Sequence, residues 1–165
     1  GVWVWALVGR ERRRACEGGA EGVAALTAAR LREAYVGTGR MGRLAAVRDI
    51  WSGGGDYAYG RMVLTAYAAA RLPVDADLGD DTGALIASML TAGLDGDAMR
   101  WAGTVDAGSE AWALLALADP RRTVGVTDGE LDSFVDDDGS AGQRRSRLLL
   151  AGLAGLARIA RGRVA

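Results

Sequence analysis

Two stretches of the chain, residues 83–92 and 111–118, contain no charged residue, and this restricts the fold more than any other feature. Both lie between helix signals: Thr82 and Ser109 can cap their starts, and Gly93 can end the first. A helix that is apolar on all sides is stable only where other helices surround it. The sequence therefore predicts an all-α fold in which neighbouring helices shelter these two segments.

The predicted helix caps recur at regular intervals, which suggests repeated units. Each interval begins with an apolar helix and continues into an acidic connector, and the last two connectors include a shorter helix. Such a rhythm is typical of tandem helical hairpins. In general form the chain resembles an α-solenoid of the tetratricopeptide or HEAT type, without either consensus, and an irregular helical bundle is the alternative. The caps, separated by 26, 27 and 31 residues, are Asp56, Thr82, Ser109 and Ser140.

Helical periodicity and capping residues predict further helices in most of the remaining chain. The last helix contains Gly152 and Gly155, each of which costs about 1 kcal/mol relative to alanine. We therefore expect the backbone of a neighbouring helix to approach closely there. Trp112, within an uncharged segment, is expected in the core. Capping boxes are predicted at Thr127–Glu130 and Ser140–Gln143, and further helices at 20–36, 40–51, 56–71, 95–101 and 147–159.

The composition excludes several classes of enzyme. The chain has no histidine, and all 20 basic residues are arginine. Ser-His-Asp and Cys-His pairs, zinc sites with histidine ligands, a P-loop lysine and a Schiff-base lysine therefore cannot form. Cys16 is the only cysteine, so no internal disulfide is available, and we interpret it as a small, partly buried apolar residue. The lack of lysine also fits the codon bias of a GC-rich, bacterial genome.

A length of 165 residues favours a single domain, residues 1–165. Because the chain begins at Gly1, we expect it to be a region of a longer protein. The apolar run 2–8 is too short to span a membrane. No signal identifies a compartment, so a cytoplasmic location is only the default expectation.

Charge is distributed in three blocks. Residues 1–61 hold 10 arginines and 6 acids, residues 62–140 hold 4 and 15, and residues 141–165 hold 6 and none. The total of -1 therefore hides an acidic middle between basic ends. The favoured interpretation is that the ends neutralise the middle, within one fold or within a homo-oligomer. Alternatively, the acidic middle faces a basic partner.

Two acidic clusters are the candidate binding residues: Asp75, Asp77, Asp80 and Asp81, and then Asp136, Asp137 and Asp138. The first does not match the ligand spacing of an EF-hand loop. The plainest interpretation is that these carboxylates stabilise helix N-termini. As functional residues, they would place the contact surface for a protein partner in the loops 73–81 and 128–138.

The stretch Gly79-Asp80-Asp81-Thr82-Gly83-Ala84-Leu85-Ile86 resembles the Asp-Asp-Thr metal motif of ADP-ribosylglycohydrolases, over about 25 of the 165 residues. This resemblance implies that Asp80, Asp81 and Thr82 help to hold Mg²⁺ against the ribose of a substrate. An Mg²⁺-dependent, carboxylate-based hydrolase is therefore one alternative function.

The favoured hypothesis is a non-enzymatic interaction or scaffold module that binds a protein partner or other domains of its own chain. A further alternative is a structural part of a larger enzyme. No catalytic residue, resident metal or cofactor is assigned. The arginines at 10–14 and near the C-terminus could contact phosphates, but the overall acidity argues against a nucleic-acid partner, and no membrane partner is expected.

Overall fold

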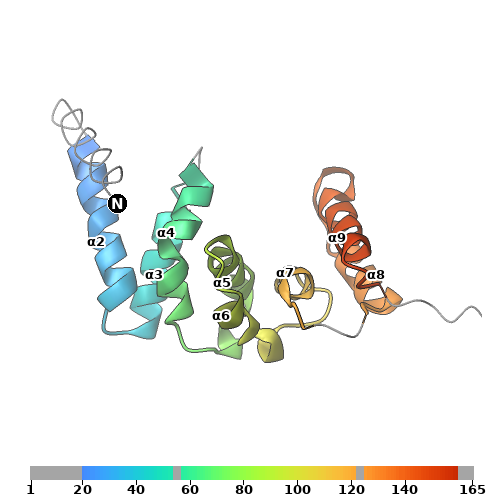
Figure 1. Cartoon of the computed structure of the whole chain (residues 1–165). Coiled ribbons are helices and arrows are strands. Elements are labelled where there is room, and N and C mark those ends of the chain that lie inside the picture. Colours follow the sequence, from blue (N-terminus) through green and yellow to red (C-terminus); the bar gives the residue numbers. More distant parts are fainter. Residues whose placement is uncertain (1–19, 54–56, 122–124, 160–165) are drawn as a thin grey trace, which may run out of the picture. The chain divides into compact units, whose positions relative to one another are not determined.

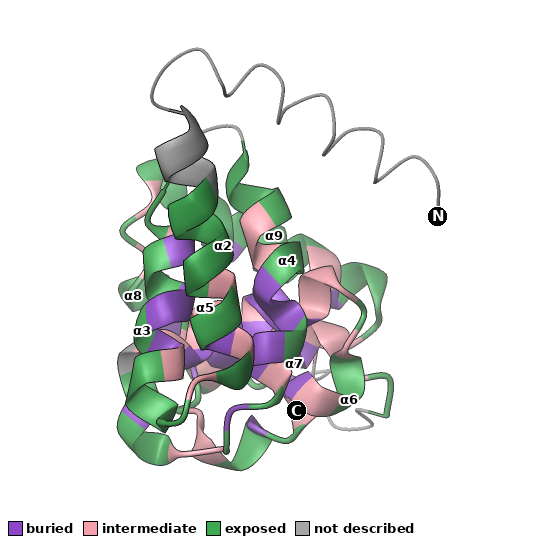
Figure 2. Cartoon of the chain, turned by 90° about the vertical axis from the view of Figure 1, so that its left-hand side faces the viewer, coloured by how far each residue is buried: buried purple, intermediate pink, exposed green. Residues whose placement is uncertain are grey.

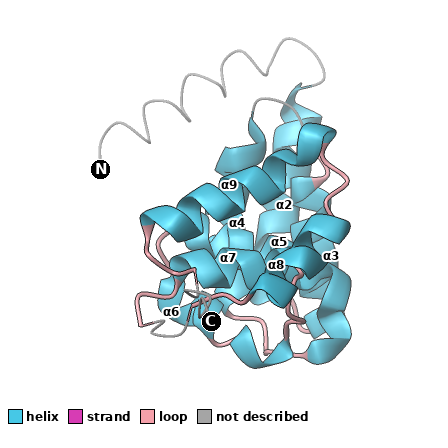
Figure 3. Cartoon of the chain, turned by 90° about the vertical axis from the view of Figure 1, so that its right-hand side faces the viewer, coloured by secondary structure: helices cyan, strands magenta, loops and turns pink. Residues whose placement is uncertain are grey.

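The computed structural model describes residues 20–53, 57–121 and 125–159, and among them it is all-α (Figure 3). The described part of the chain contains no strand, apart from one isolated parallel bridge between Val126 and Ile159. None of its helices is long and apolar enough to cross a bilayer. The predictions for Cys16, for the arginines at 10–14 and for the cap at Asp56 lie outside the described residues, as do the side chains of residues 20–24 and Asp80.

The chain divides into two compact units, Gly1–Ala58 and Tyr59–Ala165. In the first unit, helix α2 (Ala20–Val36) packs against α3 (Arg40–Trp51), both at the predicted positions. Polar contacts also join the pair, because Arg43 Nε donates to the Ala34 carbonyl at 3.1 Å. The buried residues of α3, coloured in Figure 2, are Leu44, Ala46, Val47 and Ile50. Whether the two units form the single domain expected over 1–165 stays a prediction.

In the second unit the helix α7 lies between α5 and α9 and contacts both (Figure 1). Helix α6 packs on α5 and α7, and α8 packs on α9. The unit begins within α4 (Ala58–Ala70) and continues with η3 (Ala76–Leu78), α5 (Gly79–Thr91), α6 (Asp95–Met99), η4 (Ala102–Thr104), α7 (Glu110–Ala118), α8 (Asp128–Asp136), η5 (Ala141–Gln143) and α9 (Arg144–Gly155).

The two uncharged segments are sheltered, as predicted. No residue of 83–92 or 111–118 is exposed, and Leu85, Ile86 and Met89 are completely buried. Burying one such side chain contributes about 1.5–3 kcal/mol. Trp112 is also buried, and its ring lies 6.5 Å from that of Phe134, measured between centroids. These residues make α5 and α7 the interior helices of the second unit.

Buried polar groups of the second unit form hydrogen bonds within and between its helices. The Ser88 hydroxyl of α5 donates to the Met62 carbonyl of α4 at 2.7 Å, and it lies 3.3 Å from the buried hydroxyl of Thr65. Among the described side chains, no buried nitrogen or oxygen lacks a hydrogen-bond partner. Buried hydroxyls therefore join α4 to α5 without leaving an unsatisfied group.

Several predicted helix ends are confirmed by their hydrogen bonds. Ser109 accepts from the Trp112 amide at 3.1 Å, and Thr127 and Glu130 form the predicted capping box. At the end of α5, Gly93 has φ +71° and the Leu94 amide bonds the Met89 carbonyl at 3.0 Å. The bond completes a Schellman ending, and it confirms Gly93 as the helix end expected from the sequence.

Other predicted ends are wrong. Helix α5 begins at Gly79, before Thr82, and α9 covers Arg144–Gly155 in place of 147–159. The capping box Ser140–Gln143 does not form, because Gln143 adopts φ +51°. Helix α9 stops early because Ala157 has φ +54° and the Arg158 amide folds back to the Leu153 carbonyl at 2.8 Å.

The two glycines of α9 differ in their surroundings. A Cβ atom added to Gly152 would lie 2.8 Å from Leu117 Cδ2 of α7, whereas nothing lies within 4 Å of one added to Gly155. The predicted approach of a helix backbone is therefore not found at Gly155, and at Gly152 the nearest atoms belong to the Leu117 side chain and not to a backbone.

Candidate interaction surface

The first acidic cluster lies at the start of α5. Asp75 caps the short helix η3, since its carboxylate accepts from the Asp77 amide at 2.9 Å. Asp77 is exposed and Asp81 is half-buried. Asp80 and Asp81 occupy the first turn of α5. A negative charge at that end of a helix is favoured by the helix dipole, which agrees with the plain interpretation of the cluster.

Thr82 of the Asp-Asp-Thr motif is buried, and its hydroxyl donates to the Leu78 carbonyl at 3.1 Å. That bond lies within the first turn of α5, so the hydroxyl proton is directed at the backbone. In the described ranges, no group of three or more aspartate, glutamate, cysteine or histidine residues is placed to hold a metal ion. The side chain of Asp80 is not among those described, so a site that includes it stays a prediction.

The second acidic cluster splits into two parts. Asp136 and Asp137 are exposed, whereas Asp138 is half-buried and binds the start of α9. One carboxylate oxygen of Asp138 accepts from the amide and hydroxyl of Ser140 at 2.9 and 2.5 Å, and the other from those of Ser146 at 2.9 and 2.6 Å. These bonds, mainly those from the two hydroxyls, hold the pKa of Asp138 well below its usual range.

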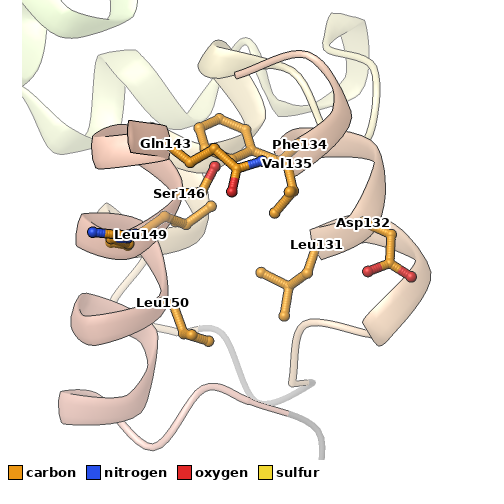
Figure 4. Close-up of a pocket in the computed structure, with 9 residues that line it drawn as sticks. Leu131, Asp132, Phe134, Val135, Gln143, Ser146, Leu149 and Leu150 are labelled. Carbon is orange, nitrogen blue, oxygen red and sulfur yellow. The ribbon is translucent and has the colours of Figure 1, made fainter. Parts of the chain in front are cut away.

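A groove of about 320 Å³ lies between α8 and α9. Apolar side chains form most of its wall: Leu131, Phe134 and Val135 from α8 and Leu149 and Leu150 from α9. Figure 4 shows the leucines of the two helices on opposite sides of the groove. The same helices join α7 in a buried cluster that includes Trp112, so the groove lies beside a packed core. The groove can accept apolar side chains.

Oppositely charged side chains line the two sides of the groove, Asp132 from α8 and Arg147 from α9. On α8, Asp128, Asp132 and Asp136 recur every four residues and are exposed, which places them on one helix face. On α9, Arg144 and Arg147 are exposed. None of these five side chains forms an ion pair with another described residue. Arg145, between the two arginines, pairs with Glu110 of α7 at 3.1 Å.

Arg158, which follows α9, has a structural position that the sequence did not indicate. Its Nη1 donates to the carbonyls of Ala116 and Leu117 at 2.8 and 2.7 Å, and its Nη2 to that of Asp119 at 2.5 Å. These carbonyls lie at the C-terminal end of α7, where a cation is favoured. Arg158 is one of the C-terminal arginines that could contact phosphates, but its guanidinium already binds carbonyls at the end of α7.

The sequence indicated a contact surface in the second acidic loop, but it did not indicate the groove beside that loop. A weak signal was present: Leu131 and Val135 are four residues apart on α8, and α9 contains three consecutive leucines, 148–150. Which of those leucines would face α8 depends on how the two helices pack. Of them, Leu149 is buried, while Leu148 and Leu150 are 65% and 49% exposed.

No protein-family model, curated protein or solved structure matches the chain.

Proposed function

We propose that this chain is a non-enzymatic protein-interaction module built from helical hairpins, and that the groove between α8 and α9 is its binding surface. The observation that carries the proposal is an open apolar groove lined on opposite sides by Asp132 and Arg147, neither of which forms an ion pair with a described residue. Apolar side chains, of which Leu150 is the most exposed, beside two charges that no described residue neutralises offer both affinity and orientation to a partner.

The packing order of the second unit supports the hairpin part of the proposal. Helix α5 packs on α7 and α7 on α9, while the shorter helices α6 and α8 each follow one of them in the chain. In an array of stacked hairpins, the first helix of each hairpin contacts the first helix of the next. Such arrays bind partners along surfaces formed by successive units, and α8 with α9 forms one such surface.

The groove fits the apolar face of a helix. A partner helix would insert side chains spaced three or four residues apart between the leucines of α8 and α9. The acidic rim belongs to the loop region 128–138, which was expected to contact a partner. The acids of 73–81 contribute less to this proposal, because Asp75 is engaged in a local cap.

The test compares two leucine substitutions of equal exposure. Leu150 lines the groove and is 49% exposed, whereas Leu156 lies after α9, outside the groove, and is 50% exposed. Tagged chain would be used to capture partners from a lysate at several salt concentrations. We expect Leu150→Asp to abolish a specific capture that Leu156→Asp retains, with both variants folded by circular dichroism. Equal capture by the two variants would refute the groove as the binding surface.

The hydrolase alternative rests on the resemblance of Asp80, Asp81 and Thr82, and no contact in the described ranges favours it. Calorimetric titration with Mg²⁺, Mn²⁺ and Ca²⁺ tests it directly. A structural role within a larger enzyme is a separate proposal, which the length of the full gene product tests.

A further inference from the structure

We infer that a second copy of the same chain packs over the groove between α8 and α9, related to the first by a two-fold axis parallel to the groove. This inference rests on the proposed function, because it takes the groove as a protein-binding surface and names its partner.

The first observation is the division of charge between the rims. The α8 rim presents Asp132 beside the groove and the α9 rim presents Arg147, and both residues line it. Each is exposed, and neither forms an ion pair with a described residue of its own chain. The surface therefore carries one negative and one positive edge, and no described residue of the same chain neutralises either.

The direction of the two-fold axis determines which helices of the two copies face each other. A two-fold axis parallel to the groove turns the surface over and exchanges its two sides, so α8 of each copy faces α9 of the other. Asp132 of one copy then meets Arg147 of the other, and the symmetry forms this contact twice. An axis across the groove would bring α8 against α8 and place like charges together, so electrostatics selects the first arrangement.

The apolar residues follow the same symmetry. Leu150 is half-exposed on the α9 side, and Leu131 and Val135 are half-buried on the α8 side. Figure 4 shows the side chains of Leu131 and Leu150 across the groove from each other. In the dimer, Leu150 of each copy lies over the α8 wall of the other. An unrelated partner would need its own acidic and basic edges at this spacing, whereas a second copy carries both.

The experiment is a charge exchange, read by sedimentation velocity of the full chain over a range of concentrations. We expect the wild-type chain to dimerise, more weakly at high salt. Asp132→Arg alone and Arg147→Asp alone should each weaken the dimer about tenfold or more, because each change puts like charges together at two contacts. Dimerisation should return when both changes are made in one chain. It should also return when the two single variants are mixed, because both contacts then pair opposite charges.

Two control variants change the net charge by the same amounts as Asp132→Arg and Arg147→Asp, but away from the groove. Asp106→Arg and Arg121→Asp alter exposed residues of the same unit that do not line the groove. Both should dimerise as the wild type does. Circular dichroism checks that every variant is folded, and recovery in the mixture excludes misfolding as the cause of dissociation.

Two results would overturn the inference. A wild-type chain that stays monomeric at all concentrations would remove the second copy as occupant, while leucine-dependent capture of another protein would still support the proposed function. A dimer that survives both single charge reversals would show that the copies associate through a different surface.

Discussion

Arg158 should be one of the largest single contributors to the stability of the second unit. Its guanidinium donates three hydrogen bonds to carbonyls at the end of α7, including that of the fully buried Ala116. Hydrogen bonds from charged groups contribute about 1.5–3 kcal/mol each, but three bonds from one half-buried group do not add. Loss of the side chain also leaves carbonyls without partners, at about 1–3 kcal/mol for a buried group.

We therefore expect Arg158→Met to lower the free energy of unfolding by about 2–4 kcal/mol. Arg158→Lys should recover part of this loss, because an ammonium group keeps the charge but cannot reach all three carbonyls in one plane. Urea unfolding followed by tryptophan fluorescence measures the effect, since Trp101 and Trp112 are buried in this unit.

Arg121→Met is the matched control, because Arg121 is exposed and its side chain has no bond with another described residue. Its free energy of unfolding should stay within about 0.5 kcal/mol of the wild type. If Arg158→Met also stays within that range, the three bonds do not stabilise the helix end and the reasoning is wrong.

Three further predictions concern α9 and its neighbours. In thermal unfolding, Gly155→Ala should stabilise the chain by up to about 1 kcal/mol, whereas Gly152→Ala should gain less or destabilise because its methyl group displaces Leu117. Equal effects would show that the contact with α7 does not matter. Gly108 has φ +84° and its added Cβ would lie 2.6 Å from α8, so Gly108→Ala should destabilise by about 1–2 kcal/mol or more; an unchanged urea midpoint would contradict this. The lowered pKa of Asp138 means that its stabilisation is present above about pH 4 and is lost as the pH falls below that value. Asp138→Asn should therefore lower the Tm at pH 7, with a difference that shrinks towards pH 2; a difference independent of pH would exclude the carboxylate as the cause.

Local patterns predicted the helices well because the signals that create them lie within a few residues. Uncharged segments at 83–92 and 111–118 must be sheltered whatever surrounds them, and both are. Ser109 and the Thr127–Glu130 pair bond amides one turn away, so their spacing alone predicts the contact. Ser140–Gln143 has the same spacing but failed, because Asp138 reaches forward to Ser146 and fixes the start of α9 from outside the pattern.

The proposed interaction surface was predicted less completely. The sequence identified the acidic residues of 128–138 as candidates, but it could not separate Asp138, which binds α9, from Asp132, which is exposed beside the groove. Nor could it distinguish Arg158, bound to α7, from Arg147 beside the groove. Each distinction depends on residues far away in the chain.

Helical periodicity, capping signals and composition were enough to predict that this protein is helical, where most of its helices lie and which catalytic chemistries are excluded. Periodicity and capping are short-range effects, and composition needs no structure at all. The packing of the helices determines three features that no local signal indicated. It leaves Leu148 and Leu150 exposed, it brings Arg158 to the end of α7, and it places Asp132 and Arg147 on opposite sides of one groove. These features arise where α7, α8 and α9 meet. The contacts between these helices join residues far apart in the chain, so no pattern within a few residues predicts them.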